Sequence, residues 1–423
     1  MTLALFSIFA VLMLLRVPIA ISLALSTVFV LMQGNFNMNM VPQRLFTSLD
    51  SFPLMAIPGF VVAGVLLARG GISKYLIDAL RTWVGHLPGG LSVVTVLACM
   101  VFAAISGSSP ATAAAIGSIM IPAMINAGYD KKYTMGLIAA SGTLGILIPP
   151  SIPLIIYGIT AEESIGKLFM AGVIPGVVLG GILIVSAIYY AKKHGYGKDE
   201  KATMAQRTKA SIKAIWGAFL PILILGSIYT GVATPTESAV IAVAYAIIVS
   251  AFIYRELHWR DLRPILVESI NITSMIFLII AAASLFGLYL TNAQVPQQVG
   301  AWIAESNMNK WVFFIIVNIL FFVMGAFLEA VSIILITLPI LLPIIKHLGI
   351  DPIHFAIVMT VNMELAMITP PVGLNLFVVS GIAKEKLEAV VKGVIPFIVL
   401  FIFVLALLVI FPQFSLWLPG MMQ

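Results

Sequence analysis

The chain has 423 residues, of which 61% are hydrophobic and only 9% are charged. Soluble domains carry roughly 25% charged residues, so this composition excludes a water-soluble enzyme or binding domain and places the chain in a lipid bilayer. The net charge of +6 does not indicate nucleic-acid binding, because the basic residues lie in short connections between apolar runs, which is how membrane topology is encoded.

The first apolar run, residues 1–32, contains Arg16 and Pro18 and lacks a small-residue cleavage site followed by a polar stretch. We therefore interpret it as part of the mature protein rather than as a removable signal peptide. It predicts either one tilted span or two short spans divided at Arg16. Apolar runs long enough to cross a bilayer, about 20 residues each, recur as far as Phe411, and we expect residues 1–423 to form one membrane unit.

A polar cluster interrupts the apolar sequence within residues 88–127, where Ser106-Gly107-Ser108-Ser109 precedes Pro110. Ser109 has the chemistry of an N-cap, and Pro110 suits the first helical position. The pattern predicts a re-entrant hairpin whose second helix begins at membrane depth. The free amides at such a helix N-terminus favour an anion.

The following apolar segment, about residues 132–160, contains the doublet Pro149-Pro150. Two residues without amide donors free the carbonyls of the preceding turn, here those of Gly145 and Ile148. Hydrocarbon cannot satisfy free carbonyls, so such breaks are tolerated where protein or a water-filled site covers them. This segment therefore predicts a broken helix whose carbonyls are available to a cation.

In the middle of the chain, the charged residues indicate the topology. The densest basic cluster lies within residues 192–213, and the positive-inside rule places this loop in the cytoplasm. The segment Thr234-Pro235-Thr236-Glu237 predicts a capping box at a helix start. Asp130 and Asp351 also precede predicted helices, and we interpret them as caps rather than cation ligands. The predicted spans here are residues 168–191, 215–230, 238–254 and 265–290.

The motifs recur at a constant offset of 221 residues: Pro149-Pro150 returns as Pro370-Pro371, and Val173-Ile174-Pro175 returns as Val394-Ile395-Pro396. The same offset carries the serine-rich tip to Phe327–Ala330. Four spans and one hairpin lie between the copies, so the second copy starts from the opposite face and the repeat is inverted. The predicted first repeat is 1–190; the second is 224–411, with its hairpin at 310–347 and its broken helix at 352–381.

Two acidic residues, Glu329 and Glu364, are predicted to lie at membrane depth, where ionisable groups are costly and usually functional. We expect Glu329 at the second tip to contact a ligand; the alternative for both is a structural pairing with a buried donor. Asn362 and Asn375 flank the second Pro-Pro doublet. They are candidates to orient a ligand, or they only link helices.

The tip SGSSPATAAAIG, together with the spaced IPP and TPP breaks, resembles the large membrane subunit of tripartite ATP-independent periplasmic (TRAP) transporters, the DctM-like family. The resemblance covers nearly the whole chain. It implies an elevator-type sodium symporter in the bacterial inner membrane, importing an organic acid such as a C4-dicarboxylate or a sialic acid. It also implies a small membrane subunit and a periplasmic binding protein as partners.

The expected fold is thus an all-α polytopic membrane protein in which the hairpins and broken helices form a transport domain. The scaffold would comprise about residues 1–53, 168–254 and 390–418. Na⁺ is the expected coupling ion. No G-x-x-x-x-G-K-[ST] loop is present to bind ATP, and we expect no organic cofactor.

The family's sodium sites can be carried across to this sequence residue by residue. The first would fall on Ser106, Ser108, Gly145, Ile148 and Pro150, and the second on Gly325, Phe327, Ala366 and Thr369. Some relatives carry an acidic residue where this chain has Thr112. The substrate-binding candidates are Ser108, Ser109, Thr112, Glu329, Asn362 and Asn375.

The same motifs bear on three other classes of function. A passive anion channel also uses re-entrant hairpins and helix dipoles, and an ion-coupled carboxylate transporter could work without a binding protein. An intramembrane enzyme would need an activated serine, a histidine base or a metal pair. The sequence contains no H-E-x-x-H pair and no histidine near Ser106 or Ser108, so we expect no enzymatic activity.

Overall fold

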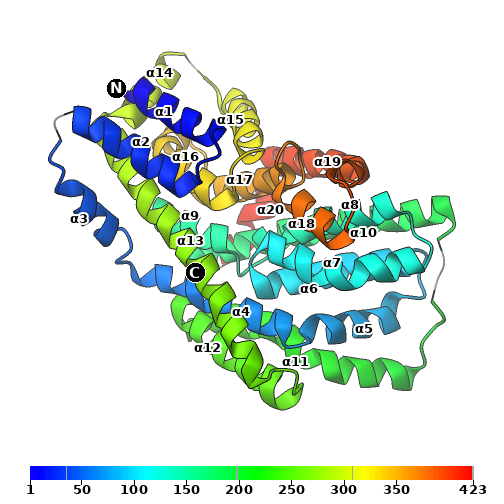
Figure 1. The fold of residues 1–423 in the computed structure, drawn as a ribbon. Helices are drawn as coiled ribbons and strands as arrows, with labels where there is room; N and C mark the ends of the chain where they lie inside the picture. The colour runs from blue at the N-terminus through cyan, green and yellow to red at the C-terminus, as the bar shows by residue number, and fades with distance from the viewer. Residues whose placement is uncertain (35, 197–198, 307, 422–423) are drawn as a thin grey trace.

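The structure is a computed structural model that describes residues 1–34, 36–196, 199–306 and 308–421, and within these ranges it consists of helices without a strand (Figure 1). Seven of the described helices are long and apolar enough to cross a membrane. They cover Phe52–Arg69, Ile165–His194, Met204–Tyr229, Pro235–Ile253, Trp259–Asn292, Ala330–His347 and Leu387–Ile410. The prediction of an all-α polytopic membrane protein is confirmed.

The N-terminal apolar run forms two short helices, α1 (Thr2–Leu14) and α2 (Ile19–Gln33). Arg16 lies in the turn between them with a positive φ of 62°, and Pro18 precedes the first turn of α2. Of the two interpretations left open for residues 1–32, the structure shows two helices divided at Arg16. The elements that follow are α3 (Met40–Thr47), the 3-10 turn η1 (Phe52–Met55), α4 (Ala56–Arg69) and α5 (Ile72–Val84).

A second set of long helices comes from the middle of the chain: α11 (Met204–Tyr229), α12 (Pro235–Ile248) with the π-turn η3 (Val249–Ile253), α13 (Trp259–Asn292) and α14 (Val295–Glu305). The capping box predicted at the start of α12 is present. The Thr234 backbone N–H donates to Glu237 Oε2 at 2.7 Å, and the Glu237 N–H donates to Thr234 Oγ1 at 3.3 Å. Part of the basic loop before α11, residues 197–198, lies outside the described residues.

The serine-rich segment forms a helical hairpin of α6 (Gly90–Ser106) and α7 (Ser109–Asn126). Gly107 at its tip has a φ of 60°, which suits a residue without a Cβ. The N-cap of α7 is Ser108, whose backbone is extended, and Ser109 is already helical. The prediction of Ser109 as N-cap was therefore wrong by one residue, because Gly107 completes the turn on its own and lets the helix begin earlier.

The first Pro-Pro segment breaks a helix as predicted, into α8 (Lys131–Gly142), a 3-10 turn η2 (Thr143–Ile146) and α9 (Ile152–Ala161). Asp130 caps α8 by accepting from the Tyr133 N–H at 2.8 Å. The long helix α10 (Ile165–His194) then follows.

The second half repeats this order of elements. It contains the hairpin α15 (Lys310–Gly325) and α16 (Ala330–His347), the broken helix α17 (Pro352–Met367) and α18 (Leu374–Ala383), and then α19 (Leu387–Ile410), α20 (Gln413–Leu416) and η4 (Pro419–Met421). Asp351 caps α17 as expected, accepting from the Ile353 and His354 N–H groups. Helix α16 begins and ends 221 residues after α7. Both Pro–Pro peptide bonds are cis. The opposite orientation of the two halves in a membrane stays a prediction.

The helices pack as two groups, and Figure 1 shows α4, α5, α11 and α12 of the first group side by side along the lower edge. The frame group comprises α1–α5 and α11–α13, in which α12 packs on α4, α11 on α5, and α13 on α2 and α4. The hairpin group comprises α6–α10 and α15–α20, in which α19 packs on α8 and α10 packs on α6, α9 and α17. Helices α4, α5, α11 and α13 carry most of the contacts between the groups, and α14 packs on α13 and more extensively on α16.

The expected scaffold, residues 1–53, 168–254 and 390–418, stays a prediction. Within it, α10 and α19 lie against the broken helices, whereas α11 and α12 lie against α4 and α5. Close backbone contact holds α19 against α8. A Cβ added to Gly136 in α8 would overlap the Gly393 carbonyl in α19, so these two helices meet at their glycines.

Candidate functional site

The first hairpin tip lies directly against the first Pro-Pro break. A Cβ built on Gly107 would lie 2.8 Å from the Pro150 carbonyl oxygen, and the Ile152 N–H donates to the Gly107 carbonyl at 3.4 Å. The amides that would have paired with the Gly145 and Ile148 carbonyls in a continuous helix belong to residues 149 and 152. Residue 149 is a proline without an N–H, and the Ile152 amide is committed to Gly107. Both carbonyls thus lose their helical donors.

Small hydroxyl groups fill the space behind this tip. Ser106 Oγ and Thr112 Oγ1 are 2.8 Å apart, and Thr112 Oγ1 donates to the Ser108 carbonyl at 2.9 Å. A Cβ on Gly145 would lie 2.5 Å from that carbonyl oxygen and 2.8 Å from Thr112 Oγ1. The structure therefore brings together the hydroxyls and carbonyls of Ser106, Ser108 and Gly145, as predicted for the first cation site, and adds Thr112.

The second tip has the same backbone arrangement as the first. A Cβ on Gly325 would overlap the Ala366 Cβ, and the Val372 N–H donates to the Ala326 carbonyl at 3.1 Å. Thr369 Oγ1 donates to the Leu365 carbonyl at 2.7 Å. Gly325, Ala366 and Thr369 thus lie together, as predicted. Phe327 lies at the same tip with its side chain 54% exposed, so only its backbone could serve a cation.

Glu329 precedes the first turn of α16 without capping it through its side chain. Its Oε1 is buried and has no hydrogen-bond partner among the described residues. Burying a carboxylate oxygen without a donor is costly. The position therefore suits a group that receives a partner from a bound ion or ligand.

A cavity of about 430 Å³ separates the two tips and is bounded by the N-termini of both α7 and α16. Its polar lining includes Ser108, Ser109 and Glu329 from the predicted set. Two further cavities of about 330 Å³ adjoin it, one beside Ser106 and Ser108 and the other beside Phe327 and Glu329. Two helix N-termini aimed at one space favour an anion there.

Sequence reasoning missed Glu268 in α13, which lines two of these cavities. The signal was available, because Glu268 is an acidic residue within an apolar helix, the same feature that singled out Glu329. It also missed Arg69, whose place beside the cavity depends on how α4 packs.

Two of the predicted substrate residues, Asn362 and Asn375, make hydrogen bonds between helices in the structure. Asn362 Nδ2 donates to both the carbonyl and the Oδ1 of Asn318, so it ties α17 to α15 and does not line a described cavity. Asn375 accepts from Ser109 Oγ at 3.0 Å and donates to the Ala139 carbonyl at 3.0 Å. It therefore ties α18 to α7 and α8 and positions Ser109. Amide side chains cross-link helices in this way in many membrane proteins.

Glu364 is fully buried in α17, and neither of its carboxylate oxygens has a hydrogen-bond partner among the described residues. The structure shows no pairing of Glu364 with a buried donor among the described residues, and Glu364 lines none of the described cavities near the tips.

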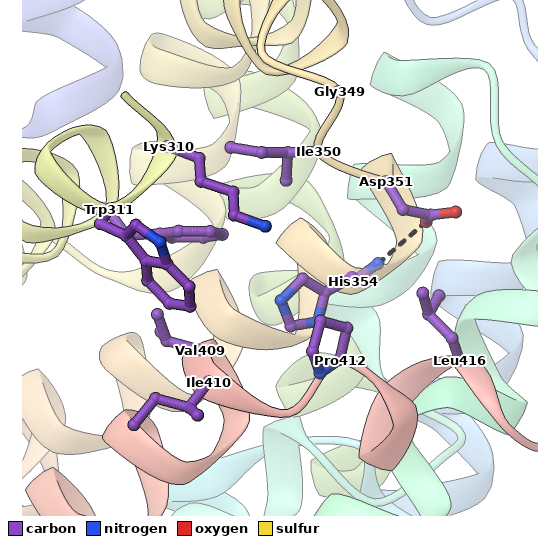
Figure 2. Close-up of a pocket in the computed structure, with 11 residues that line it drawn as sticks. Lys310, Trp311, Gly349, Ile350, Asp351, His354, Val409, Ile410, Pro412 and Leu416 are labelled. Atoms are coloured by element: carbon purple, nitrogen blue, oxygen red, sulfur yellow. Dashed lines mark hydrogen bonds between the residues drawn. The ribbon is translucent and has the colours of Figure 1, made fainter. Parts of the chain in front are cut away.

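A separate cavity of about 250 Å³ lies where α15 begins and α19 ends, and Figure 2 shows Lys310 and Trp311 facing His354 across it. His354 is 3% exposed and its Nδ1 lies 2.7 Å from Ser415 Oγ. It is therefore a buried residue of α17. Helix α15 has 16 residues, about 24 Å at 1.5 Å per residue, so this cavity is remote from the second tip and holds none of the predicted site residues.

The fold and the cavity between two helix breaks define a membrane permease. The chain belongs to the family described as the tripartite ATP-independent periplasmic transporter, DctM component, whose model matches residues 6–414. It is accordingly a TRAP transporter large permease and a multi-pass protein of the inner membrane.

Similar proteins agree with this assignment. The chain is 42% identical to the C4-dicarboxylate TRAP transporter large permease protein DctM of Rhodobacter capsulatus, over 99% of each chain. It is 36% identical to the sialic acid TRAP transporter permease protein SiaT of Haemophilus influenzae, over 97% of this chain and 67% of that one. The YdaH transporter of Alcanivorax borkumensis shares the fold, with a TM-score of 0.65 over 89% of each chain and 14% identity.

Proposed function

We propose that this permease is a sodium-coupled importer of an organic acid that works by an elevator mechanism. The observation that carries the proposal is the cavity between the two tips, where two helix N-termini suited to an anion lie close to the carbonyl and hydroxyl oxygens of both tips, which suit a cation. Coupling of an anion to a cation at one midplane site is the arrangement that broken helices provide in secondary transporters.

The two Na⁺ ions would bind behind the tips. The first site would use Ser106, Thr112 and the carbonyls of Ser108, Gly145 and Ile148, which are hard oxygen ligands. The second would use the backbone around Gly325, Ala366 and Thr369. Pro150 would close the first site through the contact between its carbonyl and Gly107.

The substrate would be delivered by a periplasmic binding protein, and a small membrane subunit would complete the permease. Relatives are named for C4-dicarboxylates and for sialic acid, so the substrate class we propose is a small organic acid. Ser108, Ser109 and Glu329 would contact it in the central cavity. No ATP is involved in this proposal, since the ion gradient supplies the energy.

The moving part would be the hairpin group and the fixed part the frame group. The support is that α10 and α19, which follow the two broken helices in the chain, pack within the hairpin group. A disulfide engineered between α5 and α6 should then stop uptake, whereas one engineered between α5 and α11 should leave it intact. The single native cysteine of the sequence, Cys99, is buried and should not interfere.

The proposal is tested by reconstituting this chain with its small subunit and binding protein in proteoliposomes. Uptake of radiolabelled succinate and N-acetylneuraminate is measured with and without an inward Na⁺ gradient. We expect uptake of an organic acid that requires both the gradient and the binding protein. Steady conduction of anions without Na⁺ dependence would instead identify a channel.

A further inference from the structure

An ion pair lies at the edge of the cavity beside the first tip. Arg69, the last residue of α4, donates from Nη2 and Nε to Glu268 Oε2 of α13, at 2.6 and 3.1 Å. Both side chains are 44% exposed, and both line this cavity together with Ser106 and Ser108. A half-exposed pair of this kind adds little to stability, so its position demands another explanation.

Arg69 carries the positive charge beside these cavities. Among the described residues lining the three cavities next to the tips, it is the only basic side chain, whereas Glu268 and Glu329 are acidic. An organic anion entering a space with two carboxylates needs a cation to offset the repulsion. Helix N-termini supply partial charge only, and Arg69 is the available full charge.

The distance from Arg69 to the first tip suits a small molecule. Helix α4 crosses the tip at Gly64, where an added Cβ would lie 3.1 Å from the Ser106 Cα. Arg69 follows five residues later, which is about 7.5 Å along the helix axis at 1.5 Å per residue. A short molecule with an acidic group at each end can therefore reach the guanidinium and the N-terminus of α7 together.

The Arg69 guanidinium also has N–H donors that Glu268 does not use. Nε and Nη2 both donate to one oxygen of Glu268, and no described residue accepts from Nη1. Arginine carries five N–H donors in a planar fork that matches a carboxylate. An incoming carboxylate can thus bind to the free side of the fork and then displace Glu268.

We propose that Arg69 is a substrate-binding residue that pairs with one carboxylate of a dicarboxylic acid, and that Glu268 holds the guanidinium in place when substrate is absent. The second carboxylate lies at the N-terminus of α7. The inference rests on the proposed import of organic acids and narrows it to dianions. It also means that substrate bridges the frame group and the hairpin group.

The test uses the purified complex of this chain with its small subunit, with succinate and its monoamide, succinamate, as probes. Affinities are measured by ligand-induced thermal stabilisation. Arg69→Gln should weaken succinate binding about tenfold or more, as expected for a lost charge-assisted bidentate contact, and should change succinamate binding far less. Arg69→Lys should be intermediate, because lysine offers a point charge without the fork.

Glu268→Gln removes the competing carboxylate and should strengthen succinate binding several-fold. The matched control is Arg81→Gln, because Arg81 makes a similar ion pair with Asp199 at 2.6 Å but lines none of the three cavities. This control should bind succinate as the unmodified protein does.

The inference is overturned if Arg69→Gln binds succinate normally, or if it weakens succinate and succinamate equally, since the residue would then act only on the fold. It is also overturned if the unmodified complex binds no dicarboxylate. Sodium-driven uptake of N-acetylneuraminate in that last case would leave the proposed function standing without this subsite.

Discussion

The two hairpin tips share a backbone arrangement but differ in the chemical groups that they expose. At the first tip, Ser106, Thr112 and the Ser108 carbonyl satisfy one another within a closed set of hydrogen bonds. At the second, the carboxylate of Glu329 has an oxygen without a partner among the described residues. An internal repeat can thus preserve backbone geometry while its two copies carry different chemical groups, here neutral oxygens at one tip and a carboxylate at the other.

The largest expected effect comes from filling the space at the first tip. Gly145→Ala places a methyl group 2.5 Å from the Ser108 carbonyl oxygen, and because backbone must move to accept it, we expect uptake to fall by about a hundredfold and stability by about 1–3 kcal/mol. Uptake in proteoliposomes and thermal unfolding measure the two effects. Gly181→Ala is the matched control, since an added Cβ there meets nothing within 4 Å; equal behaviour of the two variants would contradict the tight first tip.

Removing the charge of the second tip should have the next largest effect. Glu329→Gln keeps the shape of the side chain, and losing one charge-assisted contact of about 1.5–3 kcal/mol should reduce the apparent affinity for the ligand or ion by about 10- to 100-fold. The measurement is the dependence of uptake on substrate and on Na⁺ concentration. Unaltered dependence on both would show that the unpaired oxygen of Glu329 has no role in binding.

A smaller effect is expected from the hydroxyl cluster. Thr112→Val removes an oxygen that contacts both Ser106 and the Ser108 carbonyl, and we expect an about tenfold weaker apparent affinity for Na⁺, equivalent to about 1.4 kcal/mol. Thr337→Val is the control, because its hydroxyl bonds only to Ile333 of its own helix. If both variants respond to Na⁺ alike, the cluster does not bind the ion.

The smallest effect is expected at the asparagines that link helices. Asn362→Ala and Asn375→Ala should each lower stability by about 0.6–1.7 kcal/mol, the range for hydrogen bonds between membrane helices. Asn362→Ala should keep normal substrate affinity, whereas Asn375→Ala should weaken it, since Asn375 positions Ser109 at the cavity. A loss of substrate affinity in Asn362→Ala would instead place Asn362 in the substrate site.

Local patterns in the sequence predicted the helix breaks and helix caps of the site better than the contacts between residues that are distant in the chain. The Pro-Pro doublets, the serine-rich tip and the capping box at Thr234 each act within a few residues, and the structure has all three features. The cap of α7 was misplaced by one residue. The contacts that assign roles join distant parts of the chain: Ser109 and Asn375 are 266 residues apart, and Arg69 and Glu268 are 199 apart.

The sequence could not predict which helices pack together, for a related reason. Hydropathy shows that α10 and α19 are apolar, but it does not show which neighbour they pack against. That choice depends on small residues such as Gly136 and Gly393, which meet only after the chain has folded. His354 likewise contacts Ser415, which is 61 residues away in the chain, and its local sequence does not reveal that contact.

Each hairpin packs across the boundary between the halves. Helix α7 lies against α18, and α16 lies against α9, so each hairpin is covered by the second segment of the other half's broken helix. Neither half alone can therefore bury its own hairpin. Two fragments cut between α10 and α11 would each be incomplete, and folding of one would depend on the presence of the other in the same membrane.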